Sequence, residues 1–183
     1  MTVIEVINAA AVELGLESDV QEYLSGISTQ GKQDAEALLR CYNNVENELA
    51  LDYLPLYAEE ELETETGVIR YGELSKPVVR ILKVTDVWGN DSEFKLFPAY
   101  LKTQAGRVLV RYAYTPTEKS FGDECEFHTL VSLRLFVYGV VAEFCLLGGR
   151  YEESAVWDRK YKEAIACAYR SRPAKQLRAR RWV

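Results

Sequence analysis

The hydrophobic pattern of the chain changes its period twice. Residues 1–54 and 124–170 repeat apolar side chains at three- and four-residue steps, which is typical of amphipathic helices. Between them, residues 67–114 read as strands joined by short turns. Both helical parts carry an apolar stripe that needs a partner, so we expect them to pack together as one bundle. The predicted fold class is therefore α+β, mainly α: a helical bundle with an inserted small antiparallel β-sheet and an extended C-terminal tail.

Capping signals divide the helical parts into five helices. Thr2 and Glu5 match a capping box, and Gly15 is a natural stop for the first helix. Pro55 ends the third helix, because the residue before a proline disfavours helical backbone. The predicted helices span residues 2–14, 18–26 (capped by Ser18 with Gln21), 32–54, 124–147 (capped by Asp123 with Glu126) and 150–170.

The central part is predicted to hold three or four antiparallel strands. Residues 78–84 and 108–114 are rich in β-branched and aromatic side chains, with turn residues at 88–91 and 105–106. Residues 93–102 form a further strand, in which Pro98 indicates an edge or a bulge. An acidic run precedes these strands and is predicted as a solvated loop or a strand edge; its members are Glu59, Glu60, Glu61, Glu63 and Glu65.

These boundaries predict one helical domain interrupted by an insertion. The bundle comprises residues 1–55 and 115–171, the inserted β sub-domain residues 56–114, and the extended basic docking tail residues 172–183. Pro173 interrupts the helical pattern before the tail, so the tail can leave the body of the protein.

Charge is distributed very unevenly along the chain. Residues 1–169 hold 16 basic and 28 acidic side chains, whereas residues 170–183 hold six basic and no acidic ones. The body is therefore too acidic to bind nucleic acid over a broad surface. The basic end closes with Trp182 and Val183, and a cationic arm with a buriable aromatic tip is suited to docking on a partner. A frayed, solvated C-terminus is the alternative.

No residue pattern indicates catalysis, a metal site or a cofactor. The only histidine, His128, stands among apolar residues and is interpreted as structural, and no nucleophile elbow, zinc motif or phosphate-binding loop is present. The four cysteines are widely spaced and fall on predicted helices, which indicates free thiols and folding in a reducing, intracellular compartment. The apolar stretch 127–147 contains Arg134 and Glu143, so we expect a buried helix and no membrane span or signal peptide.

Several segments resemble the head-to-tail connector, or adaptor, proteins of tailed bacteriophages. The opening helix pattern from Val6 to Leu16 is similar to the start of these proteins, and so are the long helix that ends at Leu54 and the segment 77–84 that leads to Gly89. The later segments look like the tubular-protein branch of that group; they are 110–116, 133–149 and 161–168. The resemblance covers nearly the whole chain as element order and apolar spacing, without a single specific motif.

The resemblance implies a structural virion protein, made in the host cytoplasm and resident in the neck. Such proteins form a ring of about twelve copies that joins the portal to the tail, retains packaged DNA and contacts the genome in passing. A downstream tail or neck protein is a further implied partner. The C-terminal segment would bind the portal, with arginines at an acidic rim and Trp182 in an apolar groove. The implied docking residues are Arg172, Lys175, Leu177, Arg178, Arg180, Arg181, Trp182 and Val183.

Three further hypotheses stay open. The acidic run could face the channel lumen or a tail component, since negative walls repel phosphates. The protein could be a tail-completion or tail-tube-terminator protein that binds the tail instead of the portal. It could also be a small DNA-binding packaging accessory protein, for which the logarithmic salt dependence of binding would have a slope of about −5 if all six charges met duplex DNA.

Overall fold

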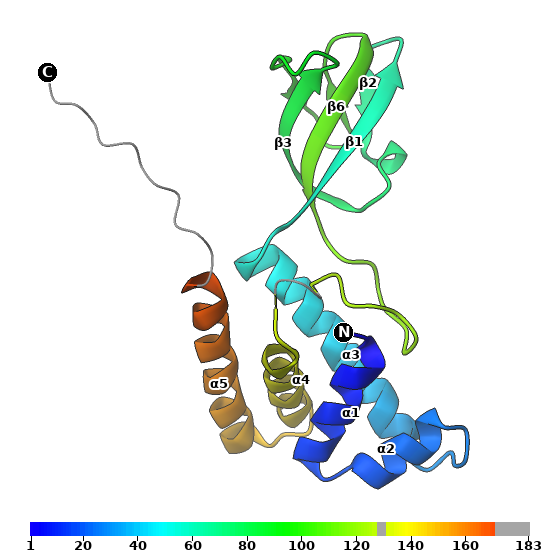
Figure 1. Ribbon diagram of the computed structural model, residues 1–183, viewed down its shortest axis with the longest axis vertical. Coiled ribbons are helices and arrows are strands. Elements are labelled where there is room, and N and C mark those ends of the chain that lie inside the picture. Colours follow the sequence, from blue (N-terminus) through cyan, green and yellow to red (C-terminus); the bar gives the residue numbers. More distant parts are fainter. Residues whose placement is uncertain (128–130, 171–183) are drawn as a thin grey trace, which may run out of the picture. The chain divides into compact units, whose positions relative to one another are not determined.

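The structure, a computed structural model, describes residues 1–127 and 131–170 (Figure 1). The chain divides into two compact units. One is helical and combines residues 1–42 with the described residues from 121 to 170, and the other comprises residues 43–120 and contains the strands. His128 and the predicted docking tail 172–183 lie outside the described residues.

The helical unit is built around helix α4. Helices α1 (Val3–Leu14) and α5 (Tyr151–Arg170) both contact α4 (Leu133–Leu147), and α2 (Glu17–Leu24) contacts α1. The Ser154 hydroxyl of α5 donates a 2.9 Å hydrogen bond to the Ala142 carbonyl of α4. The unit thus joins the beginning and the end of the described chain.

An aromatic cluster forms the centre of this unit. Tyr42 lies on α3 (Lys32–Glu48), and its ring stacks on that of Phe136 of α4 at 5.4 Å between centroids. Phe127 contacts the same Phe136 ring at 6.2 Å. All three residues have no exposed surface. Aromatic side chains bury the largest apolar area of any type, so this cluster contributes strongly to the stability of the unit.

The predicted capping box is confirmed at the first helix. The Thr2 hydroxyl accepts from the Glu5 amide, and the Glu5 carboxylate accepts from the Thr2 amide at 2.8 Å. Gly15 ends α1 in the left-handed conformation at φ 71°, which glycine adopts without steric cost. The predicted cap at Ser18 is wrong: α2 begins one residue earlier, at Glu17, and its N-cap is Leu16.

At Gly31 the main chain passes close to the main chain of α2. A Cβ atom at Gly31 would collide with the main-chain carbonyl of Asp19 in α2. The main chain would have to shift, so Gly31→Ala is expected to lower the free energy of unfolding by about 2–4 kcal/mol. Gly72→Ala is the matched control, because a Cβ there meets no atom within 4 Å. Urea unfolding monitored by circular dichroism measures both; equal midpoints would contradict the prediction.

The β unit consists of two three-stranded antiparallel sheets that share one core. The first has the order β1 (Leu56–Thr64), β6 (Gly106–Tyr114), β3 (Val78–Asp86). The second has the order β2 (Val68–Arg70), β5 (Tyr100–Lys102), β4 (Lys95–Leu96). Ile69 and Leu101 of the second sheet belong to the same buried cluster as Val110 and Tyr112 of the first. Alternate residues of the paired sheets therefore point inward.

The Asn43 side chain connects the chain that enters the β unit with the chain that leaves it. After α3, a π-helix (Leu49–Tyr53) leads to β1, and residues 115–120 follow β6. The Asn43 amide donates to the Lys119 carbonyl at 3.1 Å and accepts from the Lys119 amide at 2.7 Å. This two-way bond joins the entering and leaving chains.

The predicted fold class is wrong. In place of a mainly α bundle with one small inserted sheet and an extended tail, the described residues form a mixed α+β fold with two three-stranded sheets. Most of the acidic run lies in an additional strand, β1. Its outward positions are glutamates, which give the segment a polar sequence pattern. The predicted strand 93–102 is instead a short hairpin, β4–β5, which Pro98 interrupts because proline has no amide hydrogen to donate.

The predicted helix 124–147 also begins too early. Helix α4 begins at Leu133, with Ser132 as its N-cap. Residues 123–125 instead pair with the N-terminus: the Val3 amide donates to the Asp123 carbonyl at 3.0 Å, and the Cys125 amide donates to the Met1 carbonyl at 3.2 Å. These tertiary bonds hold the segment in extended form, so Asp123 does not cap α4.

Candidate functional site

Of the two predicted interaction features, the basic tail and the acidic run, the structure describes only the acidic run. All predicted docking residues, from Arg172 to Val183, lie outside the described residues, and α5 before them is described to Arg170. The acidic run, by contrast, is described completely. It forms the edge strand β1 and the bend that follows it, where Glu65 lies.

The glutamates of β1 divide between the two faces of the sheet. Glu59, Glu61 and Glu63 are exposed on the outer face, and Glu60 is half-buried on the inner face. On the neighbouring strand, Arg107 lies 3.6 Å from Glu61 and 3.8 Å from Glu63. The single guanidinium of Arg107 pairs with the carboxylates of both Glu61 and Glu63, so the outer side of β1 keeps an excess of negative charge.

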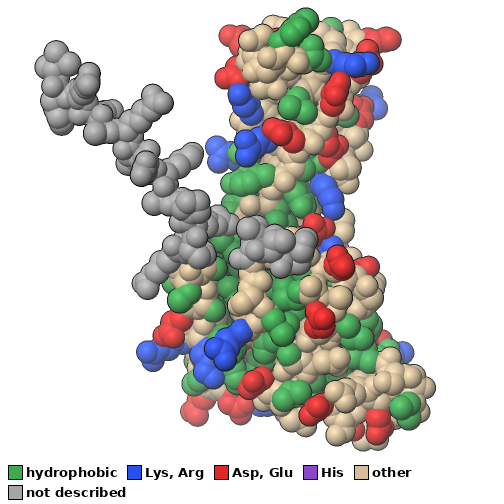
Figure 2. Space-filling model, in the orientation of Figure 1, with side chains coloured by type: hydrophobic (Ala, Val, Ile, Leu, Met, Phe, Trp, Pro, Cys, Tyr) green, Lys and Arg blue, Asp and Glu red, His purple; other side chains and the backbone are tan. Residues whose placement is uncertain are grey.

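The opposite edge of the same sheet is basic. Arg80 and Lys83 of β3 are exposed, and Lys83 is in register with Arg111 of β6, which is in register with Glu59. Figure 2 shows acidic and basic side chains on both sides of this unit. Lys83 also pairs with Asp91 at 2.6 Å. The outer face therefore changes from negative at β1 to positive at β3.

Glu60 belongs to a small polar cluster on the inner face. Its carboxylate accepts hydrogen bonds from the hydroxyls of Tyr112 and Ser75, and from the Ser75 amide at 3.1 Å. Burial of Glu60 favours its neutral form, but the bonds from Ser75 and Tyr112 outweigh it and lower the pKa of the carboxyl. Burial and the bond to Glu60 raise the pKa of Tyr112. The cluster attaches the segment before β3 to β1.

Glu60→Gln is expected to destabilise the β unit in a pH-dependent way. The substitution puts an amide donor against the Ser75 amide and removes a charge-assisted bond, which costs about 1–2 kcal/mol at neutral pH. Because the pKa of Glu60 is lowered in the folded state, its contribution is present above the unfolded pKa and is lost as the pH falls through the folded pKa. The difference from the unmodified protein should therefore shrink in acid.

Urea unfolding at neutral and acidic pH measures this effect. Glu59→Gln is the control, because Glu59 is exposed on the same strand and should change the unfolding midpoint little at either pH. A Glu60→Gln deficit that is equal at both pH values would contradict the assignment of the effect to the ionised carboxyl.

The turn after β3 holds an exposed tryptophan on a rigid support. The Asp86 carboxylate accepts from the Trp88 amide at 2.9 Å and from the amide and side chain of Asn90 at 2.8 and 2.9 Å. These bonds, the Asn90 side-chain bond foremost, lower the pKa of Asp86. Gly89 takes φ 84°. Trp88 is 82% exposed. A large aromatic side chain that is held in place without being buried is typical of an interface anchor.

The turn at residues 88–91 is predictable from its residue types, but the role of Trp88 as an exposed site is not. The available signal was a tryptophan placed inside a tight turn, where the flanking residues cannot form a core around it.

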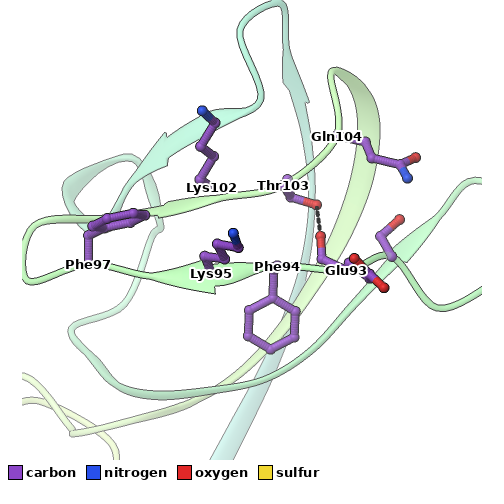
Figure 3. A pocket seen from close by; sticks show the side chains of 8 residues that line it. Glu93, Phe94, Lys95, Phe97, Lys102, Thr103 and Gln104 are labelled. Carbon is purple, nitrogen blue, oxygen red and sulfur yellow. Dashed lines mark hydrogen bonds between the residues drawn. The ribbon is translucent and has the colours of Figure 1, made fainter.

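A hollow of about 610 Å³ lies beside the second sheet (Figure 3). Lys95 and Lys102 are register partners on β4 and β5 and both line it. Phe97, which stacks on Tyr100 at 4.7 Å, lies at one end, and the Thr103 hydroxyl donates to the Glu93 carbonyl at 3.2 Å. The two lysines make the hollow basic, and Glu93 in the same lining offsets part of their charge.

The buried thiols have no features of nucleophiles. Burial and the nearby Glu143 raise the pKa of Cys41 to about 12, and burial raises that of Cys145. A thiol that stays protonated is unreactive. Within residues 1–127 and 131–170, no group of three or more His, Cys, Asp or Glu side chains is arranged to hold a metal ion. In the same ranges, no helix combines the length and apolar character of a membrane span.

Comparison with known proteins adds no relative. No protein-family model matches the chain, and no curated protein matches it. Any functional conclusion therefore depends on the chemistry of the surfaces described above and on the resemblance in the sequence.

Proposed function

We propose that this protein is a structural virion component that joins the capsid portal of a tailed bacteriophage to its tail. About twelve copies form a ring, and the basic C-terminal segment of each copy docks on the portal. The ring helps to retain the genome and to conduct it during its passage.

One observation carries this proposal: positive charge is concentrated at one end of an otherwise acidic chain. Six basic and no acidic side chains lie in residues 170–183, and the rest of the chain has an excess of 12 acidic residues. An acidic channel wall repels phosphates, while a basic arm with a terminal tryptophan suits an acidic, apolar groove on a partner protein. The exposed charged sheet and Trp88 give the β unit surfaces for further protein contacts.

Mixing the purified protein with isolated portal rings tests the proposal. We expect the protein to sediment with portal rings and not with isolated tail tubes, and to bind duplex DNA weakly. Binding to tail tubes alone would support the tail-completion alternative. Tight DNA binding with a salt slope of about −5, together with no portal binding, would support the packaging-accessory alternative.

Trp88→Ala is expected to weaken binding to the downstream neck or tail protein about 10-fold or more. The indole is 82% exposed, so its truncation removes contact area without opening a cavity in the β unit. Surface plasmon resonance against the neck protein measures the effect, and the melting temperature should stay unchanged. Leu96→Ala, an exposed apolar substitution on β4, is the control. Unaltered affinity of Trp88→Ala would show that this turn is not the contact.

A further inference from the structure

The first sheet ends in an open and regular edge strand. All nine residues of β1 pair with β6 without a bulge. On the other side of β1, the described residues provide no backbone hydrogen bond to its main chain. Such an edge invites pairing with another chain unless the protein restricts it.

The β1 carboxylates restrict which partner can approach. Two copies that met through their β1 strands would bring Glu59, Glu61 and Glu63 of both chains together, and like charges opposite each other are unfavourable. A symmetric contact between two β1 edges is therefore disfavoured. A contact with a different, basic surface of a second copy is favoured, and repeated contacts of that heterologous kind generate rings.

The β3 edge of the same sheet offers such a surface. Its distal part is covered, since the Ser92 amide donates to the Val84 carbonyl at 2.9 Å and Thr85 bridges Asp91. Among the described residues, 1–127 and 131–170, no backbone hydrogen bond covers the free side of residues 78–83. This part exposes the basic Arg80 and Lys83, of which Lys83 pairs with Asp91 at 2.6 Å, as well as the apolar Val79 (49% exposed) and Leu82 (38% exposed).

Irregularities in β3 decide the kind of contact. The register of β3 against β6 shifts between Val78 and Arg80 and again between Ile81 and Lys83. Bulges of this kind prevent a continuous backbone ladder on an edge. Side chains must therefore make the contact. The β1 carboxylates would face the basic groups of β3, and Tyr57 of β1 (52% exposed) would contact the apolar side chains of β3.

We propose that the acidic β1 edge of one copy docks on the basic β3 edge of a second copy, head to tail. The inference rests on the proposed function, because a ring requires a contact between two different surfaces of neighbouring copies. The strand directions suit it: β1 and β3 are both antiparallel to β6 and hence parallel to each other. A rotation about an axis parallel to the strands leaves the strand direction unchanged, so β1 of one copy remains parallel to β3 of the neighbouring copy. The β1 glutamates then face a neighbouring copy instead of the channel lumen.

Two charge-reversed variants test this contact. The acid-reversed variant carries Glu59→Lys, Glu61→Lys and Glu63→Lys, and the base-reversed variant carries Arg80→Glu and Lys83→Glu. Sedimentation velocity of the full chain without portal measures self-association. Each variant alone should associate at least about 10-fold more weakly than the unmodified protein, because both of its edges then carry the same sign. An equimolar mixture should recover association, since each variant complements the other.

The control variant changes the net charge by the same amount as the acid-reversed variant, through substitutions in the helical unit. It carries Glu13→Lys, Glu22→Lys and Glu152→Lys, three exposed positions on the helices, and should associate like the unmodified protein. Circular dichroism establishes that every variant is folded. Association of the unmodified protein should also weaken as salt rises from about 0.05 M to 0.5 M, a measurement that needs no variant.

Four results would overturn the proposal. They are an unmodified protein that stays monomeric at about 0.5 mM, association that is insensitive to salt, folded reversed variants that associate normally, and a mixture of folded variants that does not recover. Portal binding is measured in a separate experiment on the C-terminal segment. Loss of the edge contact with intact portal binding would refute only this inference, and loss of portal binding with intact self-association would refute only the docking function.

Discussion

Removal of residues 172–183 is expected to abolish binding of the protein to isolated portal rings. The truncation deletes five of the six basic side chains in residues 170–183 together with the terminal tryptophan. An aromatic anchor in a partner pocket contributes about 2 kcal/mol or more, which corresponds to roughly 30-fold in affinity per copy. Repetition around a ring multiplies modest contacts into a stable attachment, so loss of the segment from every copy should remove binding entirely.

The single substitution Trp182→Ala separates the aromatic from the charged contribution. We expect affinity for the portal to fall about 30-fold, with the salt dependence of binding unchanged because all basic groups remain. Surface plasmon resonance at several salt concentrations measures both quantities. Trp88→Ala is the matched control, because it removes an exposed tryptophan from the β unit and should leave portal binding unaltered. Full portal binding by the truncated chain would refute the docking function.

Phe136→Ala is expected to lower the free energy of unfolding of the helical unit by about 3–5 kcal/mol. The ring is fully buried and contacts Tyr42 and Phe127, at centroid distances of 5.4 and 6.2 Å. Its removal forfeits the transfer free energy of an aromatic side chain and leaves a cavity that neighbouring rings fill only in part. Most small domains have a total stability of 5–15 kcal/mol, so the variant should be close to unfolded at physiological temperature.

Urea unfolding followed by helical circular dichroism measures this loss. Leu147→Ala lies on the same helix at a position that is 62% exposed, and it should change the free energy of unfolding by less than about 0.5 kcal/mol. Phe136→Leu keeps much of the apolar volume and should fall between the two. Equal midpoints for Phe136→Ala and Leu147→Ala would mean that the aromatic cluster does not stabilise this unit.

Local signals predicted the elements whose conformation depends on their own residues. The capping box of Thr2 with Glu5 and the turn at Gly89 require only groups within a few positions of one another, and both are present as expected. The strand 78–84 was recognised for the same reason: its β-branched side chains favour extended backbone wherever the chain places them.

Signals that depend on distant partners were misleading. Asp123 matches a helix cap, yet backbone bonds from Val3 to Asp123 and from Cys125 to Met1 keep that segment extended. The glutamates of the acidic run left a solvated loop and a strand edge open, and pairing with β6 makes an edge strand of Leu56–Thr64, because its inward positions still bury apolar groups. Neither partner is visible in the local pattern.

For the candidate sites, the sequence by itself determined the separation of charge between an acidic body and a basic end, since charge follows from composition alone. Only the tertiary structure decided that Glu59 and Lys83 lie at opposite edges of one sheet, because their positions depend on both strands pairing with β6. It likewise decided that Trp88 is exposed. Whether a side chain is buried depends on which distant residues the fold brings around it, and no local pattern contains that information.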